Sequence, residues 1–266
     1  MNTTEHYTHG HHPSVLRAHS WRTIANSAAY LAPHLVPGLS PLDLGSGPGT
    51  ITVEFADRLA PGRVVGVDAA AEIVEQASAL GADRPNLEFI VGDAYSLPFE
   101  DDTFDISHAH QTLQHVADPV AVLREMRRVT KPGGLVAARD VDYAGTFWFP
   151  ESAGLTAWLD LYERVHRSNG GEPDAGRRIK AWALQAGFEQ ITTTASVWNF
   201  SNETDREWWG GMWEERVLKS AFAEDALSKG LATQEQLDAI SAGWREWANT
   251  EEAWILIPHG EIIAVA

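Results

Sequence analysis

Short apolar runs alternate with helical patterns between residues 41 and 140, and this alternation limits the fold more than any other feature. The runs typical of strands are Pro41–Leu44, Arg63–Val67, Leu87–Val91, Phe104–Ala109 and Gly134–Asp140. Helical spacing separates them at Gly49–Leu59, Ala71–Leu80 and Pro119–Val129, and Lys131-Pro132-Gly133-Gly134 ends the last helix. Strands joined through helices run parallel, so the pattern predicts an α/β fold with helices on both faces of the sheet.

The segments on either side of this alternation are less regular. The pattern before it predicts a helix over Val15–Leu35, ended by Pro33 and then Pro37-Gly38. The elements expected after it are helices at Ser152–Ser168 and Ala175–Gln185, a strand at Phe188–Phe200, helices within 201–250, and strands at Ala253–Ile257 and Glu261–Val265 broken by Pro258-His259-Gly260. No linker rich in Pro, Gly or Ser divides the chain, so we expect a single domain.

Composition argues against several classes of protein. The 266 residues carry 37 acidic and 20 basic side chains, a net charge of −17, which disfavours nucleic acid or an anionic membrane as the main partner. Cysteine is absent, which excludes disulfides, a thiolate metal site and a cysteine nucleophile. Neither a transmembrane run nor a secretory signal is recognisable, so a cytoplasmic protein is expected.

A glycine-rich turn, Gly45-Ser46-Gly47-Pro48-Gly49, follows the first strand and opens the first helix. Glycines allow a tight turn and let a ligand approach the backbone, and the helix N-terminus favours an anionic group. The spacing is G-x-G-x-G, which differs from the dinucleotide pattern G-x-G-x-x-G. A glycine-rich connection in an ordinary α/β fold is the structural alternative.

Three acids lie at the ends of consecutive strands. Asp68 ends the second strand, 19 residues after Gly49, where a carboxylate can accept both hydroxyls of a ribose. Asp93 follows the third strand, where it can accept from an adenine amine, and Asp43 precedes the glycine turn. Each could instead be a simple cap. Together they converge on the carboxyl edge of the sheet, where open α/β sheets bind ligands.

With these residues in place, the sequence resembles a class I S-adenosylmethionine-dependent methyltransferase, nearest the branch of ubiquinone and menaquinone C-methyltransferases. The motifs that carry the resemblance occur in order: Asp43 to Gly49, Gly66-Val67-Asp68, Gly92-Asp93-Ala94, Leu97-Pro98-Phe99 with Phe104-Asp105, His110 to His115, and Lys131 to Gly134. They concern the cofactor and say little about the methyl acceptor.

The resemblance implies a fold and a set of roles. The fold is a Rossmann-like seven-stranded, mostly parallel sheet with its last strand antiparallel, helices on both faces and a helical cap. Asp43 would lie near the methionine amino group, with Gly45, Ser46 and Gly47 along the methionine part through their backbone. Asp68 and Ala69 would meet the ribose, Asp93 and Ala94 the adenine, and His110 and Gln111 would flank the methionine moiety.

A proton acceptor would help if the nucleophile is a phenol, an enol or an activated carbon. Histidine titrates near neutral pH, and His115 is the first choice, ahead of Tyr7 and His9; His110 and Asp142 are further candidates. A hydrogen-bonded structural role is the alternative for each. His115 corresponds to the second histidine of a Leu-His-His pattern that is frequent in the family. Gln114 stands in place of the first, so a role that needs two histidines is weakened.

The N-terminal run Glu5-His6-Tyr7-Thr8-His9-Gly10-His11-His12 has enough imidazoles for zinc. No spacing elsewhere completes a metal site, so no metal is expected. Relatives fold an N-terminal segment over the cofactor and acceptor, which favours a lid with Tyr7 and His9 facing the pocket. A plain surface tail is the alternative.

Nine of the eleven Trp lie at or after Trp158, and five of these within 201–250. They would either cover a planar, partly apolar acceptor or form the core of an added helical subdomain. Arg177-Arg178 with Lys180 would pair with an anionic acceptor or form a solvated helix face. The resulting division is an N-terminal lid and helix at 1–40, a cofactor core at 41–200, a cap at 201–250 and a closing strand at 251–266.

The sequence thus predicts a methyltransferase that uses S-adenosylmethionine, releases S-adenosylhomocysteine and methylates a small, partly apolar molecule. The alternatives are a protein of the same fold that binds the cofactor without methylating, and a nicotinamide-dependent oxidoreductase, which the missing G-x-G-x-x-G disfavours. An RNA or protein methyltransferase is disfavoured by the charge, and a non-catalytic interaction module is a remote option. The oligomeric state stays open, with a homodimer as one option.

Overall fold

The computed structural model describes residues 21–266. The strands are β1 Pro41–Leu44, β2 Val64–Asp68, β3 Leu87–Val91, β4 Phe104–His110, β5 Thr130–Val141, β6 Phe147–Phe149, β7 Ile191–Phe200 and β8 Trp254–Val265. The helices are α2 Ile24–Ser27, α3 Thr50–Leu59, α4 Ala71–Leu80, α5 Pro119–Val129, α6 Ala153–Ser168, α7 Ala175–Gln185, α8 Glu203–Lys219, α9 Ala221–Ser228 and α10 Gln234–Asn249. Three 3-10 turns are η1 Ala32–His34, η2 Leu113–His115 and η3 Tyr143–Gly145.

The strands of the described chain form one sheet in the order β3-β2-β1-β4-β5-β8, with β7 and the short β6 also paired to β8. β1 to β5 are parallel, and β8 runs antiparallel to β5, β6 and β7. The expected mostly parallel sheet with an antiparallel last strand is confirmed. The eighth strand, β6, was not expected; it pairs only with the first three residues of β8.

Helices cover both faces of the sheet, as predicted. α2 and α3 pack on one face, where Leu31, Phe55 and Ile106 share a core. α5 and α7 pack on the other, around Leu123, Met126 and Ile179. The strands between them are buried on both sides, which explains their nearly continuous apolar runs.

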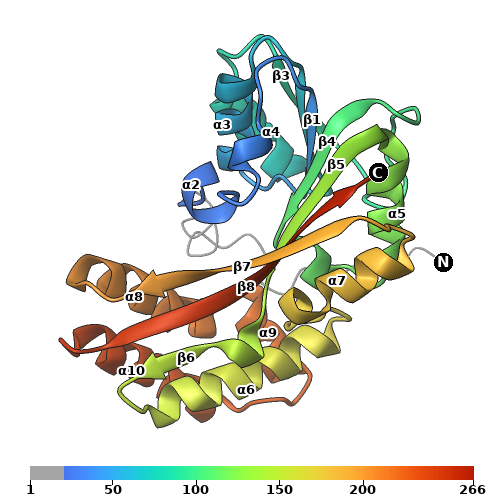
Figure 1. Ribbon diagram of the computed structural model, residues 1–266. Coiled ribbons are helices and arrows are strands. Elements are labelled where there is room, and N and C mark those ends of the chain that lie inside the picture. Colours follow the sequence, from blue (N-terminus) through green and yellow to red (C-terminus); the bar gives the residue numbers. More distant parts are fainter. Residues whose placement is uncertain (1–20) are drawn as a thin grey trace.

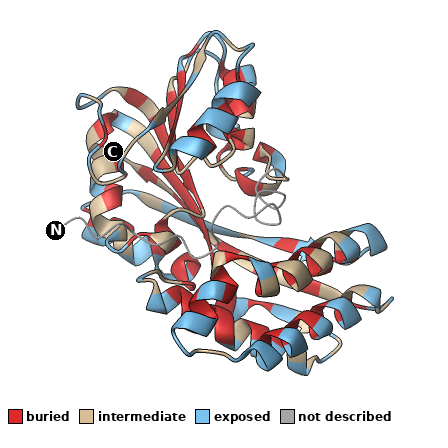
Figure 2. Ribbon diagram, turned by 180° about the vertical axis from the view of Figure 1, so that it is seen from behind, coloured by how far each residue is buried: buried red, intermediate tan, exposed pale blue. Residues whose placement is uncertain are grey.

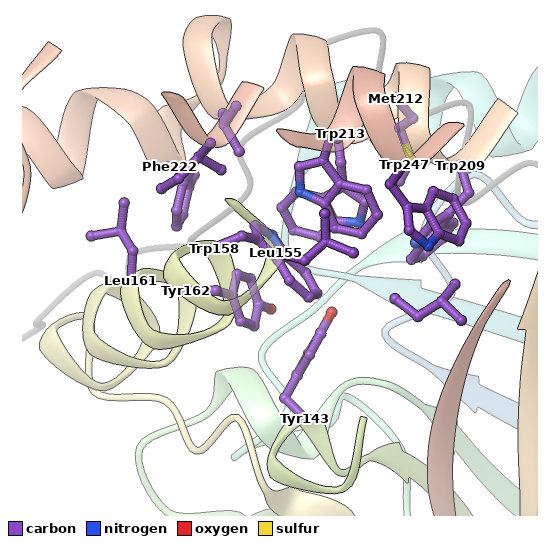
Figure 3. Packing of buried hydrophobic residues seen from close by; sticks show 14 of the residues in the cluster. Tyr143, Leu155, Trp158, Leu161, Tyr162, Trp209, Met212, Trp213, Phe222 and Trp247 are labelled. Atoms are coloured by element: carbon purple, nitrogen blue, oxygen red, sulfur yellow. The ribbon is translucent and has the colours of Figure 1, made fainter. Parts of the chain in front are cut away.

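The long strands β7 and β8 leave the parallel sheet and continue into a second group of elements, α6, β6 and α8–α10 (Figure 1). Figure 2 shows buried positions both in the sheet and in this cap. The cap has its own aromatic core, in which Trp158 packs edge-to-face on Trp213 and Trp244. Figure 3 shows Trp158 and Trp213 within this core. Four tryptophans are buried: Trp158, Trp213, Trp244 and Trp247. Of the two roles predicted for the late tryptophans, these four therefore have that of core residues.

Two predicted elements were wrong. Over residues 21–35 a continuous helix is absent: α2 stops after one turn at Ala28, and Pro33 allows only the η1 turn. The remainder of that prediction, residues 15–20, lies outside the described residues. The expected break at Pro258-His259-Gly260 is also absent, because β8 is continuous.

The position of Pro258 explains the unbroken strand. Its carbonyl accepts from Asp142 N–H, so its nitrogen also faces the side on which β8 changes partner from β6 to β5. At this junction no neighbouring strand requires the missing N–H. Gly260 is needed for packing, because a Cβ there would lie 2.1 Å from the carbonyl oxygen of Gly176 on α7.

Candidate active site

The glycine turn forms a tight left-handed cradle at the end of β1. Gly45, Gly47 and Gly49 have φ of 68°, 54° and 86°. The N–H groups of Gly45 and Ser46 both donate to the carbonyl of Val67, at 2.8 and 3.0 Å, which ties the turn to β2. A Cβ on Gly45 would lie 2.3 Å from Thr112 Oγ1, so the turn also fits closely under the segment after β4. The conformation and the close approach both require glycine.

Asp68 stands at the end of β2, facing the glycine turn. Its Oδ2 accepts from Gly47 N–H at 2.9 Å and its Oδ1 from Ala70 N–H at 3.0 Å. The side chain is half-buried and each oxygen keeps acceptor capacity, so the fixed carboxylate can still accept two hydroxyl donors. Ala69 is exposed beside it.

Asp93 and Ala94 follow β3 on the same edge of the sheet. Asp93 is exposed, and its Oδ1 accepts from Tyr95 N–H at 2.9 Å. Ala94 is half-buried and packs against the apolar core on the α5 face. The structure therefore brings Asp93 and Asp68 to the ends of paired strands, as the spacing predicts.

Asp43 lies deeper than the other two acids. Its Oδ2 accepts from Thr52 Oγ1 at 2.5 Å and its Oδ1 is 2.8 Å from His108 Nδ1, all three side chains being buried. These contacts tie β1 to α3 and β4 directly below the glycine turn. The sequence did not single out Thr52 or His108.

Gln111 is the most constrained residue after β4. It has a φ of 52°, and its N–H donates to the carbonyl of Arg139 at 2.8 Å. Its side-chain oxygen accepts from Arg22, and its amide nitrogen lies 2.8 Å from His259 Nε2. A non-glycine residue in this conformation marks a strained, over-determined position, of the kind that clusters at functional sites.

His259 is buried and neutral within this network. Burial and the nearby Arg139 hold its pKa well below the usual value. Its Nδ1 lies 3.1 Å from the carbonyl of Ile257, so Nδ1 carries the proton and Nε2 accepts from Gln111. His110 stacks on this ring at 6.3 Å between centroids, and burial together with Arg22 and Arg139 likewise lowers its pKa.

A second polar group lies around η2. The His115 ring is 4.9 Å from that of His166, and burial and this neighbour hold the pKa of His115 well below its usual value. Burial lowers the pKa of His166 to about 4. Nearby Asp140 accepts from Leu113 N–H at 3.0 Å, and burial raises its pKa to about 7.

The two arginines of the basic cluster on α7 are paired within the chain. Arg177 forms a two-pronged pair with Asp142, and Arg178 Nε lies 2.8 Å from Glu172. Asp142, a candidate base, is therefore held by an arginine.

Several residues of this edge escaped the sequence analysis: Arg22, Arg139, Asp140 and His259. Arg139 and Asp140 interrupt an otherwise apolar strand, and ionisable residues inside such a run were an available signal. Tyr7, His9 and the histidine run lie outside the described residues. Within residues 21–266 no group of three or more His, Asp or Glu side chains could hold a metal ion.

Comparison with known proteins shows the family to which this chain belongs. The profile of the methyltransferase domain family matches residues 42–138, from β1 into β5. An uncharacterized methyltransferase of Schizosaccharomyces pombe is 33% identical over 97% of this chain and 95% of its own length. The chain belongs to the methyltransferase family. A demethylmenaquinone methyltransferase of Staphylococcus saprophyticus is 29% identical to this methyltransferase over 58% of the chain and 72% of its own length.

Solved structures agree on the fold. Phosphoethanolamine N-methyltransferase 2 of Haemonchus contortus, solved with S-adenosylhomocysteine, superposes with a TM-score of 0.57 at 18% identity, over 96% of this chain and 58% of the other. At that identity the likeness shows the Rossmann-like fold.

The cofactor of this methyltransferase is S-adenosylmethionine, and the strand-end residues fit it. The cradle admits no side chain at Gly45, and the Asp68 carboxylate is fixed beside it. Ser46 Oγ is buried without a hydrogen-bond partner in the described part of the chain, so a donor and acceptor remain for a ligand. Among the described residues, no helix is both long and apolar enough to cross a bilayer.

Proposed function

We propose that this S-adenosylmethionine-dependent methyltransferase methylates a small, partly apolar organic molecule that binds beside the ends of β4 and β5. The observation that carries the proposal is an aromatic wall at this point. Trp21 is half-buried and packs on Trp198 and Trp208 at 5.3 and 5.4 Å between ring centroids. Flat aromatic faces offer a large contact area to a planar or apolar acceptor with few rotatable bonds.

We assign the cofactor contacts along the strand ends. Asp68 and Ala69 bind the ribose, and Asp93 and Ala94 bind the adenine. The residues assigned to the methionine part are Asp43, Gly45, Ser46, Gly47, His110 and Gln111. The left-handed turn and the fixed Asp68 carboxylate support this assignment, because both hold their groups in place before a ligand arrives.

When bound, S-adenosylmethionine supplies a methyl group on a sulfonium sulfur, and transfer is an in-line displacement. The chain's main task is then to align the nucleophile with the methyl carbon and to exclude water. We propose His115 as proton acceptor, because its lowered pKa leaves the imidazole neutral at physiological pH. We further propose that the N-terminal segment acts as a lid, with Tyr7 and His9 facing the pocket, and that residues 201–250 belong to the cap.

The remaining proposals concern partners and place. We propose a cytoplasmic enzyme without nucleic-acid or membrane partners, because 37 acidic residues against 20 basic ones repel phosphate-rich surfaces. A homodimer is proposed as its assembly.

The test is methyl transfer from a labelled donor to a panel of reduced naphthoquinones, phenols, carbon acids and small amines, with RNA and protein as comparison arms. The expected result is label in one small-molecule class, reduced at least tenfold in His115→Gln while S-adenosylhomocysteine still binds. Transfer only to RNA or protein would contradict the proposal.

A further inference from the structure

Three side chains on the α2 face of the sheet bury polar atoms that have no hydrogen-bond partner among residues 21–266. The atoms are Tyr30 Oη, both ring nitrogens of His110, and Nη1 and Nη2 of Arg139. Arg139 is 1% exposed and His110 is 5% exposed. Burial of a polar group without a partner is unfavourable, so these atoms need a partner that the described chain does not supply.

The three side chains form one cluster. His110 and Arg139 are paired neighbours on β4 and β5, so their side chains lie on the same face. Both approach the ring of Trp198, Arg139 Cζ at 5.2 Å and the His110 ring at 5.8 Å from its centroid. Tyr30 reaches the same place from the segment after α2, where its hydroxyl interacts electrostatically with Arg139.

The cluster is rich in donors. A guanidinium group donates hydrogen bonds and accepts none. Arg139 donates from Nε to Glu261 and Ser196, so the side of the guanidinium that carries Nη1 and Nη2 stays available to a ligand. Burial raises the pKa of Tyr30, so its hydroxyl keeps its proton, and the neutral His110 carries one N–H. Arg22 adds positive charge near His110.

The acids nearby do not fill this role. Both carboxylate oxygens of Glu261 already accept hydrogen bonds, from Arg139, Ser196 and Thr194. Asp140 faces the opposite side, where Leu113 N–H holds its carboxyl group. The chemical group that matches a guanidinium edge together with two further donors is a carboxylate, whose two oxygens accept several hydrogen bonds at once.

We propose that the Tyr30–His110–Arg139 cluster binds a carboxylate of one of the two reactants. The carboxylate is either that of the methionine half of the cofactor or one on the methyl acceptor. The inference rests on the proposed function. The position of His110 is compatible with a carboxylate from either reactant. It ends β4, two residues before Thr112, which lies against the glycine turn.

The experiment compares S-adenosylhomocysteine with its decarboxylated analogue, S-adenosyl-3-thiopropylamine, by calorimetric titration of the wild type, Arg139→Lys and Tyr30→Phe. Lysine keeps the charge opposite Glu261 but loses the two-nitrogen edge, and phenylalanine removes one hydroxyl without changing shape. If the cofactor supplies the carboxylate, the wild type prefers S-adenosylhomocysteine at least tenfold. The ratio of the two affinities then falls towards one in Arg139→Lys, and it falls at least threefold in Tyr30→Phe.

The second arm titrates benzoate into protein saturated with S-adenosylhomocysteine. If the acceptor supplies the carboxylate, benzoate binds the wild type and binding is lost in both variants, while the preference between the adenosyl ligands is unchanged. Arg164→Lys on α6, where the arginine pairs with Asp160 on the cap, is the matched control and leaves both measurements unchanged.

Thermal unfolding shows whether each variant is folded, and the isosteric Tyr30→Phe decides the matter if Arg139→Lys does not fold. An unchanged ligand preference together with absent or unchanged benzoate binding would overturn the inference, since the cluster then holds water alone. Failure of the wild type to bind either adenosyl ligand is a different result, which would overturn the proposed function and this inference with it.

Discussion

Gly45 combines two constraints that only glycine meets. Its φ of 68° is left-handed, and an added Cβ would lie 2.3 Å from Thr112 Oγ1. We expect Gly45→Ala to lower the free energy of unfolding by about 2–4 kcal/mol, combining backbone strain with steric overlap. We also expect it to weaken S-adenosylhomocysteine binding at least tenfold, because the turn must shift. Urea unfolding and calorimetry measure the two effects.

Gly133→Ala separates the two constraints. Gly133 has a φ of 79°, but nothing lies within 4 Å of an added Cβ, so this variant reports backbone strain alone, about 1–2 kcal/mol. Its cofactor binding is expected to be unchanged. Equal losses of stability in the two variants would show that contact with Thr112 is unimportant.

At the residue scale, strand-end acids and glycines were predictable because they follow the strand pattern. The geometry confirms that Asp68 and Asp93 lie at neighbouring strand ends. The contact of Asp43 with His108 was not predictable, because the two residues lie 65 positions apart in the chain. The hydrogen bond between Arg22 and Gln111 was not predictable for the same reason, because it joins residues 89 positions apart.

At the scale of elements, the cap depends on its tryptophan core. Trp158 on α6 is fully buried and packs on Trp213 of α8 and Trp244 of α10. Trp158→Ala removes this junction and is expected to lower the free energy of unfolding by about 3–5 kcal/mol. Chemical unfolding followed by far-UV circular dichroism measures the loss.

Trp208→Ala is the matched control, because Trp208 is only half-buried and faces Trp21. We expect it to cost less than about 1.5 kcal/mol and to raise the KM for the acceptor once one is found. Equal destabilisation by the two variants would contradict the division between a structural core and an acceptor wall.

Elements within the alternating region were predicted well because their periodicity is strong. α4, α5, β1 and β3 have the predicted bounds, and so does α7 beyond this region. The unbroken β8 has a tertiary cause, because two different strands share one side of it at Pro258, and local sequence does not show this. In its described part, the helix expected at Val15–Leu35 is reduced to the single turn of α2 and the η1 turn at Pro33.

At the scale of the whole molecule, buried neutral histidines set the acid limit of stability. The pKa lies below the usual 6.5 for His110, His115, His166 and His259. Below pH 6.5 the unfolded chain therefore takes up protons that the folded chain refuses, so stability falls as the pH falls. For His166, whose pKa is about 4, the loss reaches about 3 kcal/mol by pH 4.

Asp140 acts in the opposite direction. Its pKa of about 7 means that the folded state holds a proton that the unfolded chain releases near pH 4, so its stabilisation is present at low pH and lost as the pH rises through 7. Four histidines outweigh one carboxyl group, so we expect net stability to fall between pH 6.5 and 4.5.

Urea unfolding midpoints at pH 7.5, 6.0 and 5.0 measure this fall. His166→Gln keeps a donor for the Gln114 carbonyl and is expected to make the midpoint depend less on pH. The control His34→Gln, at an exposed position, is expected to leave this pH dependence unchanged. A midpoint independent of pH would contradict this view of the core.

The central claim is that the carboxyl edge of β1, β2 and β3 binds S-adenosylmethionine, and calorimetric titration of the wild type and Asp68→Ala tests it most directly. Asp68 is expected to accept two hydroxyl donors, each worth about 1.5–3 kcal/mol at a charged acceptor, so its loss should weaken binding about 100-fold or more. Asp83→Ala, which removes an exposed acid beside α4, should bind like the wild type. Binding of S-adenosylmethionine by the wild type and the control, lost in Asp68→Ala while that variant still unfolds cooperatively, is the predicted result. Equal affinity in wild type and Asp68→Ala, or no binding by the wild type, would contradict the account.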